Sequence, residues 1–61
     1  MKLKEWFRQA IVKQDTRLIG SLLAHCRFRH GMTAQETEDM ALRCVPECTA
    51  DDWRNLVNEA T

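Results

Sequence analysis

The chain has 61 residues, a formal net charge of zero, and a composition that is 44% hydrophobic and 30% charged. With two glycines and one proline, this composition excludes collagen-like and low-complexity chains, and it predicts a single folded domain over residues 1–61. A domain of this length buries only about 60% of its unfolded surface, which leaves little room for a deep substrate pocket. We therefore expect a protein that is not an enzyme.

The sequence predicts a cytoplasmic protein with no membrane partner. No apolar run approaches the roughly 20 residues that a membrane-spanning helix needs, and the N-terminal segment lacks the apolar core of a secretory signal. The three cysteines are an odd number and cannot form a closed disulfide framework, so we expect free thiols in a reducing compartment.

The spacing of the apolar residues predicts an all-α fold, a compact bundle of three to four short helices. From Leu3 to Ile11 they recur three and four residues apart, which predicts an amphipathic helix over about 3–13. A continued helix would place Gln14 and Asp15 on its apolar face. We therefore expect a break there, followed by a second helix over about 16–30; one long bent helix is the alternative.

Local signals mark where the helices begin and end. Asp15 or Thr16 can cap the second helix, and Gly31 can end it in a left-handed conformation. Thr33-Ala34-Gln35-Glu36 forms a capping box for a third helix over about 34–44, which Pro46 prevents from continuing. A looser box, Thr49-Ala50-Asp51-Asp52, begins a fourth helix over about 50–60.

Four aromatic side chains are expected to supply large areas to the core: Trp6, Phe7, Phe28 and Trp53. Because Trp6 and Phe7 are adjacent, they lie about 100° apart on a helix, so one can face the core while the other faces a neighbour. A homodimer would cover that second apolar surface. The alternative is that both rings pack into one broad core. Gly20 lies mid-helix, where it either allows a close helix approach or is simply tolerated.

A metal site is one candidate constellation. Cys26 and His30 are four residues apart, as are Cys44 and Cys48, and together they could complete a tetrahedral zinc shell. However, Cys26 and Cys44 fall on the apolar stripes, where a free cysteine behaves as a small apolar residue. We therefore expect no cofactor, with a small zinc-stabilised module as the lesser alternative.

The charges divide the chain into two opposite halves. Residues 1–31 carry seven basic against two acidic side chains, a net +5, and residues 32–61 carry two against seven, a net −5. The basic half, with His25, Arg27, Phe28, Arg29 and His30 in close succession, suggests a nucleic-acid-binding alternative. The last helix is too acidic to read bases in a helix-turn-helix, so the first two helices would have to contact DNA.

The size of the chain, its lack of a catalytic motif and its opening Lys4-Glu5-Trp6-Phe7 resemble the small accessory proteins encoded in the early regions of lambdoid phages. The resemblance is one of general character over the whole chain, and it transfers no functional residue. It implies a protein of the bacterial or infected host cytoplasm that modulates host or phage decisions by binding.

Together these features predict a regulatory protein that acts by protein–protein contact and associates with itself. We expect the contact surface to combine the exposed member of the adjacent aromatic pair with nearby cations. The predicted set is Lys4, Trp6, Phe7, Arg8, Arg27, Arg29 and His30.

Overall fold

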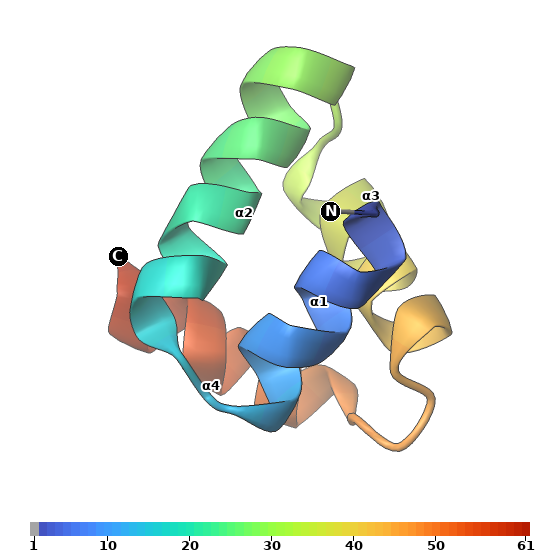
Figure 1. Ribbon diagram of the computed structural model, residues 1–61, viewed down its shortest axis with the longest axis vertical. Coiled ribbons are helices and arrows are strands. Elements are labelled where there is room, and N and C mark those ends of the chain that lie inside the picture. Colours follow the sequence, from blue (N-terminus) through green and yellow to red (C-terminus); the bar gives the residue numbers. More distant parts are fainter. Residues whose placement is uncertain (1) are drawn as a thin grey trace.

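The computed structural model describes residues 2–61, which form four helices and no strand (Figure 1). The helices are α1 (Leu3–Val12), α2 (Thr16–His30), α3 (Ala34–Cys44) and α4 (Ala50–Ala60). The predicted all-α bundle is confirmed, and α1 ends one residue earlier than expected. The longest helix, α2, packs against each of the other three.

The break between α1 and α2 is confirmed, so the alternative of one bent helix is wrong. Gln14 adopts a left-handed conformation with φ of 51°, which turns the chain sharply after α1. The Asp15 carboxylate then accepts hydrogen bonds from the backbone N–H groups of Arg17 and Leu18, at 3.0 and 3.3 Å. Asp15 is therefore the residue that caps α2.

Both predicted capping boxes are present. The Thr33 hydroxyl accepts from the N–H of Glu36 at 3.1 Å, and the Glu36 carboxylate accepts from the N–H of Thr33 at 2.9 Å. Thr49 and Asp52 make the equivalent pair at the start of α4. Gly31 ends α2 with φ of 61°, as expected from its position. These local interactions fix where the helices begin and end, independently of the core.

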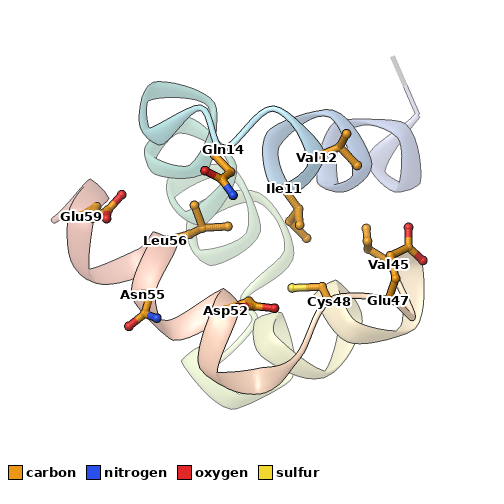
Figure 2. A pocket seen from close by; sticks show the side chains of 10 residues that line it. All are labelled: Ile11, Val12, Gln14, Val45, Glu47, Cys48, Asp52, Asn55, Leu56 and Glu59. Carbon is orange, nitrogen blue, oxygen red and sulfur yellow. The ribbon is translucent and has the colours of Figure 1, made fainter.

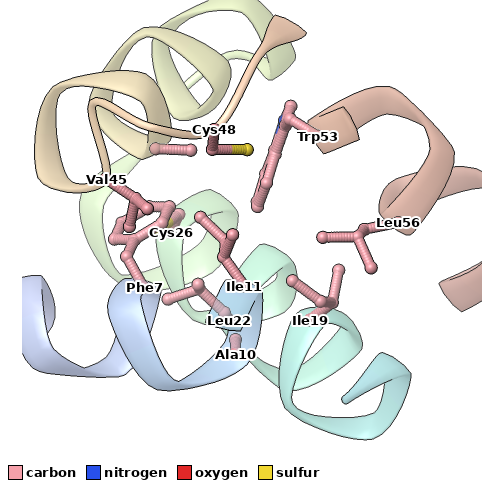
Figure 3. Close-up of a cluster of buried hydrophobic side chains, with 11 residues drawn as sticks. Phe7, Ala10, Ile11, Ile19, Leu22, Cys26, Val45, Cys48, Trp53 and Leu56 are labelled. Atoms are coloured by element: carbon pink, nitrogen blue, oxygen red, sulfur yellow. The ribbon is translucent and has the colours of Figure 1, made fainter. Parts of the chain in front are cut away.

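The core lies where the four helices face one another (Figure 3). Phe7 of α1 is fully buried and Trp53 of α4 is 2% exposed, and their ring centroids lie 5.9 Å apart. Tilted aromatic pairs at this distance stabilise a fold by about 0.5–1.5 kcal/mol beyond the area that they bury. The other buried apolar residues are Ala10, Ile11, Ile19, Leu22, Cys26, Ala41, Val45, Cys48 and Leu56.

The aromatic residues do not all contribute to the core as expected. Of the adjacent pair, Phe7 is the core member and Trp6 is partly buried, so the two rings do face different neighbours. Phe28 is 78% exposed, and the expectation that it packs in the core is wrong. It follows the fully buried Cys26 by two residues, so it points about 200° away from the face of α2 that enters the core.

An ion pair joins the two acidic helices. Glu38 of α3 is 9% exposed, and its carboxylate accepts hydrogen bonds from Nε and Nη2 of Arg54 on α4, at 2.9 and 3.3 Å. The hydrogen bond from Arg54 holds the pKa of Glu38 below its usual value, although desolvation acts in the opposite direction. The pair lies beside a hollow of about 170 Å³ between α2, α3 and α4.

The two glycines should respond in opposite ways to the same substitution. A Cβ on Gly20 would lie 3.9 Å from the carbonyl oxygen of Ala60, an ordinary contact, so Gly20→Ala should raise the free energy of unfolding by about 0.5–1 kcal/mol. Gly31→Ala should lower it by about 1 kcal/mol, because Gly31 has a positive φ. Urea unfolding of both variants provides the measurement, and a stabilised Gly31→Ala protein would contradict the assigned cap.

The Glu38–Arg54 pair should make the free energy of unfolding depend on pH. Because the folded pKa of Glu38 is lowered, the pair stabilises the fold above the unfolded value of about 4.3, and this contribution is lost as the pH falls through the folded pKa. In a cycle of Glu38→Gln, Arg54→Gln and the double variant, the coupling free energy should be larger at about pH 7 than at about pH 3. Equal coupling at the two pH values would show that the carboxylate charge is irrelevant.

Candidate functional site

The most distinctive exposed surface is the C-terminal end of α2, here called the α2 tip and defined as Arg27, Phe28, Arg29 and His30. All four side chains are exposed. The guanidinium carbon of Arg27 lies 5.7 Å from the centroid of the Phe28 ring, within range of a cation–π interaction. Cations are favourable here because the last turn of a helix carries the negative end of its dipole. The α2 tip therefore presents an apolar ring with a cation on either side in the sequence.

A row of three rings extends this surface toward α1. The ring of Trp6 lies 4.9 Å from the ring of His25, which in turn lies 5.0 Å from the ring of His30. The Nε2 atoms of the two histidines are 3.2 Å apart, so in the neutral state one can donate its hydrogen to the other. The row fixes Trp6 and His25 beside the α2 tip. His25 and Phe28 were missing from the predicted contact set.

The predicted contact surface is corrected at Phe7 and Arg8. Phe7 is fully buried and cannot contact a partner. Nη2 of Arg8 forms an ion pair with Oε1 of Glu47 at 3.2 Å, on a different side of α1 from Trp6. Residues two apart on a helix point about 200° apart, so once Trp6 packs on α2, Arg8 faces elsewhere. Lys4 is exposed on α1. Of the predicted set, the structure links Trp6 to His30 through His25. Arg27, two residues from His25, points to another side of α2 beside Phe28, and Arg29 is exposed in the same last turn.

A second feature is a hollow of about 340 Å³ between the end of α1, the loop joining α3 to α4, and α4 (Figure 2). Ile11, Cys48 and Leu56 point toward its middle, each from a different one of these segments. Apolar side chains and polar ones, including three carboxylates, share its lining. The residues that line it are Ile11, Val12, Gln14, Val45, Glu47, Cys48, Asp52, Asn55, Leu56 and Glu59.

The hollow has a negative electrostatic environment. Burial raises the pKa of the Cys48 thiol, and the negative charges of Asp52 and Glu47 raise it further. Glu59 adds a third carboxylate to the lining. Arg8 compensates the charge of Glu47, but the exposure of both partners keeps this pair weak, about 0–1 kcal/mol. The hollow thus suits a ligand that combines an apolar group with positive charge.

The structure does not assemble the zinc set. Cys26 is fully buried in the core, whereas His30, one turn further along α2, is exposed and contacts His25 instead. Cys44 is partly buried at the end of α3, and Cys48 lies in the following loop. Among residues 2–61 there is no group of three or more histidine, cysteine or acidic side chains placed to hold a metal ion. The spacing in the sequence was therefore misleading, because α2 directs the two halves of its Cys26–His30 pair to different environments.

No protein-family model matches the chain, and neither a curated protein nor a solved structure matches it. None of the helices in residues 2–61 is both long enough and apolar enough to cross a membrane.

The three thiols should differ in reactivity. Burial raises the pKa of Cys26 and of Cys48, which disfavours the reactive thiolate at both, whereas Cys44 is partly exposed. We expect Ellman's reagent to modify one thiol per folded chain quickly and all three after denaturation. Cys44→Ser should remove the fast phase. Fast modification of two or three thiols in the folded protein would contradict the assigned burial.

Proposed function

We propose that this protein is a small, non-enzymatic interaction module that binds another protein through the α2 tip and the adjacent Trp6–His25 pair. The exposure of Phe28 carries the proposal. A 61-residue domain needs its large apolar side chains for its core, yet this one leaves an aromatic ring 78% exposed between two arginines. Aromatic and arginine side chains are the residue types that most often dominate binding at protein interfaces.

The chemistry of the α2 tip specifies the kind of partner. Burying the Phe28 ring would contribute roughly 1.5–3 kcal/mol, so the partner must offer an apolar recess. Arg27 and Arg29 flank Phe28 in the sequence, and carboxylates around the recess would match them in geometry and charge. The favoured partner is therefore an acidic protein surface with an apolar pocket. Such a contact also allows self-association, since this chain has an acidic half of its own.

The proposed biological setting is a regulatory role in the cytoplasm of a bacterium or an infected host cell. It follows from the resemblance of the chain to small accessory proteins of lambdoid phages, together with its three free cysteines. A binding role is consistent with this setting, because proteins of this kind act by altering the activity of another macromolecule.

Nucleic-acid binding is the second candidate, and the arginines of the α2 tip are the observation in its favour. Two other cations already form ion pairs within the chain, so they are less available to bind phosphate groups than the sequence suggested. Arg8 pairs with Glu47, and Arg54, the one cation of α4, is held by Glu38. This alternative predicts duplex DNA binding that weakens steeply with salt. A gel shift at low salt tests it, and no shift would remove it.

Two variants of α2 with the same charge change test the proposed surface. Arg27→Glu alters the α2 tip, whereas Arg17→Glu alters the exposed first turn of the same helix. As bait in a bacterial lysate, the Arg27→Glu protein and a Phe28→Ala protein should lose the partner that wild type captures, by about tenfold or more for Phe28→Ala. The Arg17→Glu protein should retain it.

Circular dichroism provides the control for folding. Phe28 is mostly exposed, so Phe28→Ala should change the free energy of unfolding by no more than about 0.5 kcal/mol. If the Phe28→Ala and Arg27→Glu proteins are folded and capture the same proteins as wild type, the surface is wrongly assigned.

A further inference from the structure

We infer that the chain associates head to tail with further copies of itself, with the Phe28 side chain of one copy entering the acid-rimmed hollow of the next. The inference rests on the proposed function, because it uses the α2 tip as the binding surface and names a partner for it. Two complementary features of the same chain support it, one at each end of the molecule.

The first argument is apolar complementarity. Among residues 2–61, two large apolar side chains are exposed: Phe28 at 78% and Val12 at 62%. Phe28 projects from the α2 tip, whereas Val12 is among the residues that line the hollow, at its edge next to Ile11. A contact between tip and hollow would therefore bury the Phe28 ring and bring it to the edge at which Val12 is exposed.

The second argument is charge complementarity. Arg27 and Arg29 adjoin Phe28 in the sequence, and three carboxylates line the hollow: Glu47, which is already paired with Arg8, and Asp52 and Glu59. The proposed docking of the ring brings these two arginines near the carboxylates, which are exposed. Arginine and carboxylate groups match in both charge and hydrogen-bonding geometry. The contact thereby brings the basic half of one chain against the acidic half of another.

The third argument is the distance between tip and hollow within one chain. The last turn of α2 lies at one end of the long axis in Figure 1, and the turn between α1 and α2, which borders the hollow, lies at the other. The 15 residues of α2 separate them by about 20 Å. A chain cannot fill its own hollow, so the contact has to form between copies. A contact between two different surfaces leaves one of each unfilled, so it extends into longer assemblies or closes into a ring.

The contact is small and should be weak. One aromatic anchor with a few exposed charge pairs buries less surface than the interfaces of stable complexes. We therefore expect association in the range of about 0.1–1 mM, weakening as salt screens the exposed charges. Sedimentation velocity of the full chain should show an average mass that rises with concentration and passes beyond that of a dimer unless a ring closes.

Three variants separate the tip from the hollow. Phe28→Ala removes the tip and leaves the hollow intact. Val12→Lys with Glu59→Lys adds positive charge at two exposed positions of the hollow and leaves the tip intact. Glu5→Lys with Gln9→Lys is the matched control, since it makes the same charge change at exposed positions of α1 outside the hollow. The first two proteins should each associate at least about tenfold more weakly than wild type, and the control should associate as wild type does.

Mixing the two defective proteins gives the sharpest test. The Phe28→Ala protein keeps a hollow and the Val12→Lys, Glu59→Lys protein keeps a tip, so an equimolar mixture should form a 1:1 dimer that grows no further. A symmetric contact between two α2 tips predicts instead that the Val12→Lys, Glu59→Lys protein, whose tip is intact, dimerises by itself and forms no mixed dimer with the Phe28→Ala protein. A mixture that stays monomeric, or a wild-type chain that is monomeric at about 1 mM and low salt, would overturn the inference.

Failure of the head-to-tail contact can be distinguished from failure of the proposed function. If wild type stays monomeric but captures another protein in a Phe28-dependent way, the head-to-tail contact is wrong and the proposed binding surface stands. If Phe28→Ala changes neither self-association nor capture from the lysate, both are wrong.

Discussion

The contact between Phe7 and Trp53 is the interaction on which the rest of this structure depends. It joins the first helix to the last across the core, with ring centroids 5.9 Å apart and both side chains almost completely buried. Once Phe7 faces inward, helical geometry decides the other positions of α1. Trp6 turns toward His25 on α2, Arg8 turns toward Glu47, and Ile11 and Val12 reach the hollow.

A domain this small has little interior in which to build a site, so its distinctive chemistry lies on its surface. The core uses most of the large apolar side chains, and the exceptions lie at the two ends of the molecule. At one end, the Phe28 ring projects into solvent next to Arg27 and Arg29. At the other end lies a hollow lined by apolar groups and carboxylates. Both features are simple in chemistry and neither requires a cofactor, which is why binding is the function that they support best.

The opposite charges of the two halves are only partly used within the chain. Arg8 and Glu47 link the basic half to the acidic half, whereas Arg54 and Glu38 pair inside the acidic half. Arg27 and Arg29 lie in the exposed last turn of α2, where the helix dipole favours them. The sequence showed that the charges were divided, but not which of them were already paired.

The sequence by itself determined an all-α fold and the residues at which its helices begin and end, because these signals are local. Asp15, Gly31 and the two capping boxes act through the backbone of their own neighbourhood, and each was found where it was expected. The exposure of Phe28 also follows from spacing, because on α2 it lies about 180° from Ile19 and 200° from Cys26, which are both buried. Only the tertiary structure decided which member of the Trp6–Phe7 pair enters the core, and that Cys26 is buried whereas His30, one turn along the same face, is exposed. These two outcomes depend on how far each helix is covered by its neighbours, and helical spacing alone carries no information about that.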